Sequence, residues 1–230
     1  MAKPGPQAML ATWETGCRQS PQERAATLLA YVTGDDLDVA RNTDVGTRNV
    51  LLARFLTALT QDSLDFCATC RCGERLDVAL DLDMIAGWPT HEPGFRLTLQ
   101  PRDQAPIIRL PTSADLAALE GLGHEEARGR LMARCADGRV TTEVAALIDE
   151  ALEAACPAAA IGAMVACPTC GSEWEATVDL PALLWAELQY RARALLREVH
   201  ELALAYGWTE TEILALPARR RANYLQLVST

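Results

Sequence analysis

Residues 166–180 read ACPTCGSEWEATVDL, and residues 66–82 read FCATCRCGERLDVALDL. A shift of 98 positions (from 72 to 170) superposes the two segments. The matching pairs are Cys72 and Cys170, Gly73 and Gly171, Asp77 and Glu175, Asp81 and Asp179, and Leu82 and Leu180. Each segment joins a Cys-Gly turn to an alternating apolar strand, which is the pattern of a zinc ribbon. The repeat predicts that one metal ion joins the two halves of the chain.

The second of these turns, Cys167-Pro168-Thr169-Cys170-Gly171, has the regular spacing of a metal-binding turn. A structural Zn²⁺ prefers four ligands in a tetrahedron, and Cys thiolate is a favoured ligand. Two residues separate the thiols, so one tight turn aims both at the same ion. Pro168 presets φ for the turn, and Gly171 tolerates the positive φ that follows. We expect Cys167 and Cys170 to be two of the ligands.

The first turn is less regular. Cys67 and Cys70 have CxxC spacing, but no glycine follows them, whereas Cys72 precedes Gly73 but has Thr69 three positions before it. The repeat favours Cys72 as a ligand, joined by either Cys70 or Cys67, and the sequence leaves both open. The candidate ligands of one structural Zn²⁺ are Cys67, Cys70, Cys72, Cys167 and Cys170.

Redox chemistry, disulfide bonds and free thiols are less favoured roles for these cysteines. A CxxC pair also serves thioredoxin-like redox chemistry, but there it begins a helix after a strand, whereas here each motif precedes a strand-like stretch. A secreted disulfide framework is disfavoured because the chain begins MAKPGPQAML, without an apolar signal segment. We therefore expect a reducing, cytoplasmic setting. Outside the motifs, Cys17, Cys135 and Cys156 are isolated and predicted to be small buried hydrophobes.

Composition narrows the class of protein. The chain has 230 residues, of which 50% are hydrophobic and 23% charged, a balance that suits one large or two small cores. The net charge of −10 disfavours binding to nucleic acid, since phosphates are neutralised by clustered Lys and Arg. The one dense basic run, 219–221, fits a solvated or salt-bridged helix face. No apolar stretch reaches the roughly 18 residues of a membrane span.

The pattern of apolar residues predicts a mainly α fold with a small β zinc-ribbon element (α+β), in which helices surround two Cys-turn and strand repeats. The expected helices are 21–31, 47–60, 125–136, 141–155 and 181–206, with a further start at 112–113, a short helix that ends before Pro217 and a last one that carries Tyr224, Leu225 and Val228. The expected strands are 76–82, 95–99, 107–110 and the stretch that follows the second cysteine turn to Asp179. Residues 1–20 carry Pro4, Gly5, Pro6 and Gly16 and are predicted to be a flexible N-terminus. Residues 21–230 are predicted to form a single domain of two pseudo-repeats, about 21–112 and 113–230, joined by the ribbon.

Three helix ends are marked clearly in the sequence. Ser20 is the expected N-cap of the helix that begins at Pro21. Gly207 is the expected C-cap of the long helix. Thr209 and Glu212 then form a capping box, with Trp208 packed on Ile213 as its hydrophobic staple.

No catalytic constellation is evident. Of the histidines His91, His124 and His200, the last lies in the long helix without a nucleophile motif nearby, which favours a packing or capping role. His200 as a zinc ligand is a minor alternative that applies if only three cysteines bind. Trp88 and Trp174 fit core or interface anchors better than a stacking platform.

Short segments throughout the chain carry a family resemblance. In the second half they are CPTCG at 167–171, LW at 184–185, REVH at 197–200, YGW at 206–208, EIL at 212–214 and YL at 224–225. In the first half they are GTRNVLL at 46–52, CGERL at 72–76 and LPT at 110–112. With these the chain resembles T-even-like baseplate hub proteins or hub assembly chaperones of contractile phage tails and phage-tail-like injection systems. One departure is CATCRCG at 67–73, where a plain CPxCG is expected.

The resemblance implies a non-enzymatic role in assembling or completing a baseplate, with baseplate, spike or tail-tube proteins as partners. The main alternative is a cytosolic zinc-ribbon adaptor or regulator that binds some other protein. A third is an enzyme whose site the sequence hides. Composition and spacing do not separate the first two, and only the resemblance favours the injection system.

Overall fold

The computed structural model describes residues 4–60, 64–99, 107–138 and 140–228, and it confirms a mainly helical chain with small antiparallel sheets. The helices are α1 (Pro6–Gly16), α2 (Pro21–Thr33), α3 (Leu37–Asn42), α4 (Val45–Leu59), α5 (Leu82–Ala86), α6 (Ser113–Ala117), α7 (His124–Cys135), α8 (Thr142–Ala155), the 3₁₀ turn η1 (Pro157–Ala159), α9 (Leu180–Tyr206), α10 (Glu210–Ala215) and α11 (Ala218–Val228). The strands are β1 (Leu64–Thr69), β2 (Arg75–Leu80), β3 (Arg96–Thr98), β4 (Ile107–Arg109), β5 (Ala136–Asp137), β6 (Ile161–Ala166) and β7 (Glu173–Val178).

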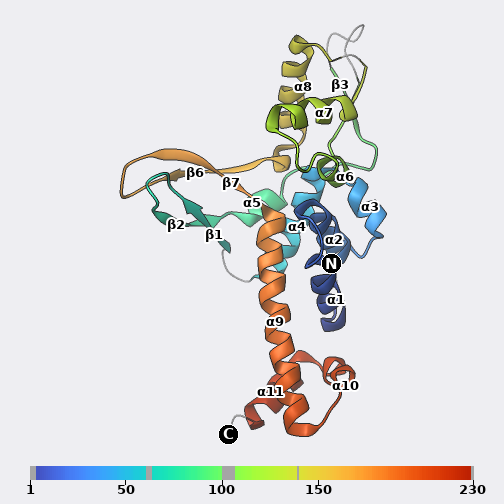
Figure 1. The fold of residues 1–230 in the computed structure, drawn as a ribbon, viewed down its shortest axis with the longest axis vertical. Helices are drawn as coiled ribbons and strands as arrows, with labels where there is room; N and C mark the ends of the chain where they lie inside the picture. The colour runs from blue at the N-terminus through green and yellow to red at the C-terminus, as the bar shows by residue number, and fades with distance from the viewer. Residues whose placement is uncertain (1–3, 61–63, 100–106, 139, 229–230) are drawn as a thin grey trace.

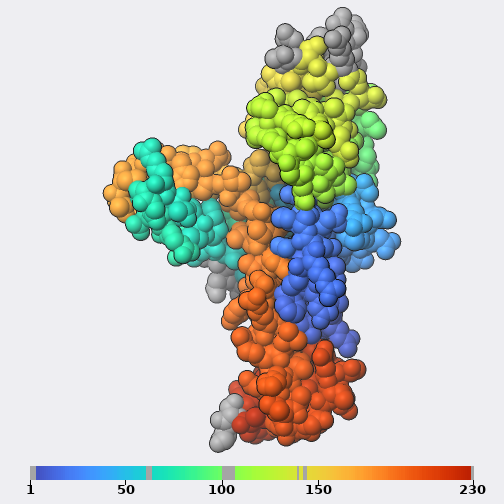
Figure 2. Space-filling view, in the orientation of Figure 1, coloured from blue at the N-terminus to red at the C-terminus, as the bar shows by residue number. Residues whose placement is uncertain are grey.

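The molecule is elongated, and a pair of hairpins projects from its side. Helix α9 runs from the middle of the molecule to the lower end, where α10 and α11 pack against it (Figure 1). Helices α7 and α8 and strand β3 lie at the opposite end. The hairpins β1–β2 and β6–β7 form an arm that stands away from the helical body (Figure 2).

The two hairpins of the arm repeat the same construction. Each is an antiparallel pair of six-residue strands, β1 with β2 and β6 with β7. A helix follows each hairpin, and its N-cap is an aspartate: Asp81 for α5 and Asp179 for α9. Each aspartate accepts a hydrogen bond from the N–H three residues on, at 2.8 and 3.0 Å respectively. The strands β1 and β6, which precede the cysteine turns, were not among the predicted elements.

Buried apolar residues gather in three clusters along the molecule. The central cluster combines α2, α4 and the start of α9 with both hairpins, through residues such as Leu52, Phe66 and Val165. A lower cluster holds α9 against α1, α10 and α11, and an upper one holds β3 and β4 against α8. Trp88 and Trp174 are partly buried against the central cluster, as predicted. The hairpins therefore share one apolar core at the base of the arm.

The expectation of a flexible N-terminus over residues 1–20 is corrected by α1 for residues 4–20, and residues 1–3 lie outside the described part of the chain. Pro6 occupies the first helical turn, where its missing N–H costs nothing, so it begins the helix rather than preventing one. Leu10 is buried in the lower cluster, and a Cβ at Gly16 would come within 2.5 Å of the Trp185 ring. Gly16 thus permits close approach to α9, and tertiary packing decides the structure of this segment.

The predicted helix ends are confirmed. The Ser20 hydroxyl accepts a hydrogen bond from the Glu23 N–H, and Gly207 closes α9 with φ of 66°. Thr209 and Glu212 form the capping box, and Trp208 packs on the cluster that contains Ile213. Among the described residues, no helix is both long and apolar enough to cross a membrane.

Candidate metal centre

The cysteine turns lie at the tips of the two hairpins, and their backbone hydrogen bonds are equivalent. In the first turn the Cys70 N–H donates to the Glu74 carbonyl at 2.8 Å. In the second the Cys167 N–H donates to the Ser172 carbonyl at 2.9 Å. Each turn ends on a glycine with positive φ, 91° at Gly73 and 69° at Gly171. A side chain at either φ would be strained, so these glycines allow the chain to turn back below the thiols.

Four thiols meet between the tips. The Sγ atoms of Cys70, Cys72, Cys167 and Cys170 all lie within 4.8 Å of one another. The Sγ atoms of Cys70 and Cys170 are 3.5 Å apart, and those of Cys72 and Cys167 are 3.7 Å apart. A disulfide would need about 2.05 Å, whereas sulfurs about 2.3 Å from a central metal lie about 3.8 Å apart at the corners of a tetrahedron. The spacing therefore fits a metal ion and not disulfides.

Cys67 is one of the five candidate ligands, but it lies outside this cluster. The expectation that it could be a ligand is therefore wrong, and Cys70 is the partner of Cys72. Cys67 lies on β1, where Phe66 and Ala68 point into the core and the Cys67 side chain is exposed on the opposite face. The Arg75 Nε donates a hydrogen bond to its Sγ at 3.3 Å. Since side chains alternate along a strand, the face that buries Phe66 and Ala68 continues to Cys70 and excludes Cys67.

A one-residue difference explains why the sequence left Cys67 and Cys70 unresolved. Strands β2 and β7 begin at 75 and 173, a shift of 98, but β1 and β6 begin at 64 and 161, a shift of 97. The first turn is therefore one residue shorter, with the ligands in a Cys-x-Cys spacing at Cys70 and Cys72. A single shift of 98 places Cys167 opposite Thr69 and hides the equivalence of Cys70 with Cys167.

Hydrogen bonds from Ser172 favour the thiolate form of Cys170, whereas Cys70 favours the thiol. The side chain and backbone of Ser172 lower the pKa of Cys170 to about 6, and its hydroxyl lies 3.2 Å from the Cys170 Sγ. A backbone hydrogen bond from Cys72 lowers the pKa of Cys70, but burial and the neighbouring thiols outweigh it and raise that pKa to about 12. Thiolates are the metal ligands, so binding of an ion here would release the protons that thiols such as Cys70 hold.

The two tips also contact each other directly. The Thr169 hydroxyl donates to a carboxylate oxygen of Glu74 at 3.0 Å. This bond crosses from the second turn to the first and links the two tips.

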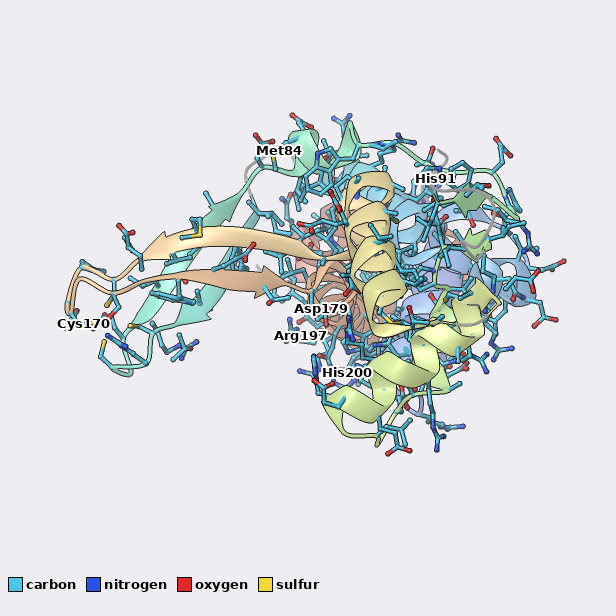
Figure 3. The ribbon with its side chains drawn as sticks, turned by 90° about the horizontal axis from the view of Figure 1, so that it is seen from above. Met84, His91, Cys170, Asp179, Arg197 and His200 are labelled. Carbon is cyan, nitrogen blue, oxygen red and sulfur yellow. The ribbon has the colours of Figure 1, made fainter. Side chains whose placement is uncertain are left out.

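The histidines lie elsewhere. Figure 3 shows Cys170 at the far end of the arm and His200 over the helical body, and His200 does not belong to the thiol cluster. The minor alternative, in which His200 is a zinc ligand beside three cysteines, is therefore wrong. The backbone N–H of His91 donates to the Thr47 hydroxyl, and its ring Nε2 donates to the Ala155 carbonyl at 2.8 Å. The His91 ring also stacks on Phe95. His124 is exposed beside Glu125.

Of the isolated cysteines, Cys135 and Cys156 are buried as predicted. Cys17 is exposed, so the prediction that it is buried is wrong. Burial raises the pKa of Cys135 to about 11 and that of Cys156 to about 12, so both remain protonated thiols.

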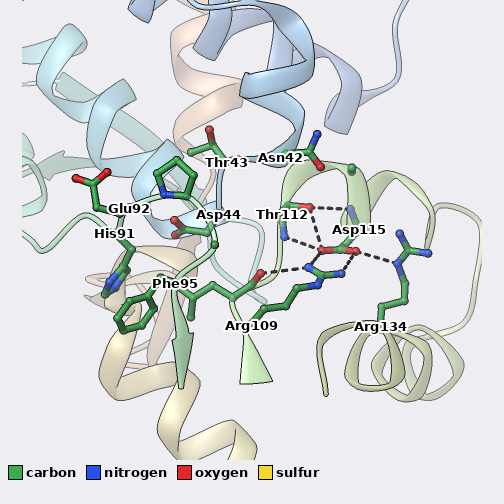
Figure 4. Close-up of a pocket in the computed structure, with 14 residues that line it drawn as sticks. Asn42, Thr43, Asp44, His91, Glu92, Phe95, Arg109, Thr112, Asp115 and Arg134 are labelled. Atoms are coloured by element: carbon green, nitrogen blue, oxygen red, sulfur yellow. Dashed lines mark hydrogen bonds and ion pairs between the residues drawn. The ribbon is translucent and has the colours of Figure 1, made fainter. Parts of the chain in front are cut away.

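A separate pocket of about 340 Å³ lies between the body and the upper end, beside an ion network (Figure 4). Asp115 is buried and accepts from both Arg109 and Arg134, at 2.5 to 2.9 Å. Burial raises the pKa of Asp115, but hydrogen bonds from Arg109, Thr112 and Arg134 outweigh it and hold that pKa well below its usual range. Asp115 also completes the capping box of α6 with Thr112. The network joins β4, α6 and α7, and two guanidinium groups share its one buried carboxylate.

No protein-family model, curated protein or solved structure matches this chain significantly. What its site can do is therefore argued from the residues themselves. Four cysteines from two distant segments could hold one metal ion at the end of the arm.

Proposed function

We propose that Cys70, Cys72, Cys167 and Cys170 hold one structural Zn²⁺, and that the chain is a non-enzymatic zinc-ribbon protein that acts by binding other proteins in the cytoplasm. The observation that carries this proposal is the cluster of four thiols within 4.8 Å. Tetrahedral sets of four sulfurs suit zinc or iron among the common metals. Four protein ligands leave no open position for substrate, which is the arrangement of structural rather than catalytic zinc.

The architecture of the arm supports a structural role for the ion. A two-stranded hairpin is marginally stable alone, and the arm consists of two such hairpins. Their bases share the central core, but their tips stand away from it (Figure 1). An ion that joins the tips would close the arm at its free end and fix residues about a hundred positions apart in sequence. Structural zinc in small fingers contributes about 10–16 kcal/mol of apparent binding free energy, ample for this purpose.

We further propose that the protein works in a contractile phage-tail-like injection system, at the baseplate or hub, as a structural component or assembly factor. The resemblance through the segments at 46–52, 167–171 and 197–214 supports this placement. The net charge of −10 suits a factor that meets a basic partner surface. A cytosolic zinc-ribbon adaptor for another protein is the second candidate, favoured by the same metal site without the resemblance.

A pull-down from native cells tests both parts. The tagged wild-type chain is captured, its partners are identified by mass spectrometry, and zinc is measured in the same eluate. We expect about one zinc per chain, together with tail-tube, spike or baseplate proteins. Cys70→Ser should lose the zinc and the partners, whereas Cys67→Ser, the same change three residues earlier on β1, should keep both.

The outcomes separate the two candidates. Zinc with partners unrelated to a tail would overturn the injection-system placement and favour the adaptor. An eluate of wild-type protein that contains no metal would contradict the zinc-ribbon role itself.

A further inference from the structure

The two ends of the elongated molecule carry charge of opposite sign. Helices α7 and α8 lie at the upper end, and the second half of α9 lies with α10 and α11 at the lower end (Figure 1). Together α7 and α8 contain six acidic residues and three arginines, a net charge of −3. Residues 191–228 contain six arginines and four glutamates, a net charge of +2 in a chain that carries −10 overall. Opposite ends of two copies therefore attract each other.

Helix α9 has an outward face on the side opposite its buried one. The buried side chains are Leu184, Leu188, Ala192, Leu195, Val199 and Leu202. At about 100° per residue, Tyr190, Arg193, Arg197, Glu201 and Leu204 fall together on the other side of the helix, and all five are exposed. Tyr190 is 67% exposed and Leu204 is 74% exposed. We call these five residues the α9 stripe.

The arginines of the α9 stripe have no ion-pair partner among the described residues. Arg191 and Arg221, which lie off the stripe, pair with glutamates, but Arg193 and Arg197 belong to none of the ion pairs within residues 4–60, 64–99, 107–138 and 140–228. Glu201 is the one acidic residue of the stripe, which leaves it a net charge of +1. Figure 3 shows Arg197 beside His200 at the surface of the helical body.

Helix α8 has an outward face of the opposite sign. Its inward face packs through Ile148, which is 1% exposed, in the upper cluster. The other side carries a set of exposed residues that we call the α8 stripe: Ala146, Leu147, Glu150, Glu153 and Ala154. Leu147 is 42% exposed. Glu150 and Glu153 form no ion pair with a described residue, so the α8 stripe has a net charge of −2.

The two stripes match in length and in pattern as well as in charge. Helix α8 has 14 residues, about 21 Å, and the α9 stripe spans about the same distance from Tyr190 to Leu204. In the α8 stripe an exposed leucine stands three positions before the first of two glutamates. In the α9 stripe Tyr190 stands three positions before the first of two arginines. Aligned along each other, the stripes bring apolar residues together and oppose the unlike charges.

We propose that the α9 stripe is the docking surface for the α8 stripe of a second copy of this chain, so that copies associate head to tail. The unlike charges steer and orient the encounter, and the apolar residues contribute buried area. The contact joins two different surfaces, so further copies add to the assembly unless it closes into a ring. One pair of short helices buries less than a standard interface, and we expect a Kd of about 0.1 mM. None of the four clustered thiols takes part, so this contact is separate from the proposed zinc site.

Analytical ultracentrifugation of the intact chain, purified with zinc, provides the test. We expect the weight-average mass to rise above the 25.0 kDa of one chain as the protein concentration increases. Raising the salt from about 50 mM to about 500 mM should weaken the association by about tenfold, because exposed charges are screened. A wild-type chain that remains at 25.0 kDa at about 0.5 mM protein in low salt would overturn the proposal.

Complementary variants identify the two surfaces. Arg193→Glu with Arg197→Glu disables the α9 stripe, and Glu150→Lys with Glu153→Lys disables the α8 stripe. Each double variant alone should remain monomeric, and an equimolar mixture should associate, because each chain keeps the stripe that the other needs. A mixture that remains monomeric while both variants are folded by circular dichroism would overturn the proposal.

Two further variants separate the α9 stripe from general electrostatic attraction and from loss of folding. Arg219→Glu with Arg220→Glu makes the same charge change at exposed positions of α11 and should weaken association by no more than about threefold. An effect equal to that of the α9 variant would overturn the assignment to the stripe. Tyr190→Ser changes no charge and no buried group, and it should weaken association by about fivefold even if the charge variants do not fold. Full association of Tyr190→Ser, or a wild-type chain that stays monomeric but binds an added acidic helical peptide at Arg193, would also overturn docking of a second copy.

Discussion

The two cysteine turns of the arm carry out the same task with different spacings. The second has the regular Cys-x-x-Cys-Gly form, and the first has Cys-x-Cys-Gly. Both keep the bond from the first ligand's N–H to the carbonyl of the residue after glycine, Cys70 to Glu74 and Cys167 to Ser172. The backbone frame of the turn, and not the number of residues between the thiols, therefore decides which sulfurs face the centre. The CxxC spacing contains both Cys67 and Cys70, so by itself it could not tell which of the two is the ligand.

The largest expected effect separates Cys70 from Cys67. Cys70→Ser should reduce bound metal from about one ion per chain to near zero and unfold the arm, because a tetrahedral site with three thiolates binds far more weakly. Cys67→Ser removes an exposed thiol that accepts a hydrogen bond from Arg75, and it should change neither metal content nor melting temperature. Elemental analysis and thermal melts of both variants measure the difference. Loss of metal in Cys67→Ser, with retention in Cys70→Ser, would reverse the assignment.

Metal removal should affect the arm more than the body. After chelation we expect amide hydrogen exchange in β1, β2, β6 and β7 to accelerate by at least tenfold, because the tips lose their common ligand. The lower cluster around Leu195 and Leu202 has its own apolar contacts and should keep its protection. Exchange mass spectrometry with and without chelator reports both regions at once. Equal acceleration in α9 would mean that the ion stabilises the whole chain and not the arm alone.

The glycines of the two turns come next in size. Gly73→Ala and Gly171→Ala should each cost about 1–2 kcal/mol, because both positions have positive φ although neither Cβ would meet a neighbour within 4 Å. Gly129→Ala is the matched control, since that glycine is exposed within α7 and has no positive φ. It should be neutral or stabilising by up to about 1 kcal/mol. Chemical denaturation of the three variants measures this, and a neutral Gly73→Ala would show that the shorter turn has another geometry.

The smallest effect concerns the contact between the tips. Thr169→Val removes the donor to Glu74 while keeping the shape of the side chain. The bond is exposed to water, so we expect the melting temperature to fall by no more than about 2 °C and metal content to stay the same. Ser172→Ala is the companion change, since it removes a hydroxyl beside the Cys170 Sγ. A loss of metal in Thr169→Val would mean that the hydrogen bond, and not the ion, aligns the tips.

The sequence predicted the parts of the arm whose signals are local. Asp81 and Asp179 were matched by the repeat, but the expected strand 76–82 is too long at its end, because β2 ends at Leu80 and Asp81 caps α5 as Asp179 caps α9. Cys72, Cys167 and Cys170 were identified through the turn glycines, and all three belong to the thiol cluster. The choice of Cys70 depends on strand β1, whose alternation of buried and exposed side chains decides the face on which each cysteine lies.

Features that depend on tertiary contacts could not be predicted from the sequence. Helix α1 is fixed by the close approach of Gly16 to Trp185, which lie far apart in the chain. The first turns of α2 and α9 meet around a small pocket that Arg48 also lines, and neither motif nor periodicity predicts that meeting. The placement in an injection system still rests on resemblance alone and stays a prediction.

X-ray absorption at the zinc edge of the purified wild-type protein tests the central claim most directly. A site formed by Cys70, Cys72, Cys167 and Cys170 predicts four sulfur neighbours at about 2.3 Å and no nitrogen or oxygen in the first shell. A mixed shell with nitrogen or oxygen, or a protein purified under metal-replete conditions without zinc, would contradict the account.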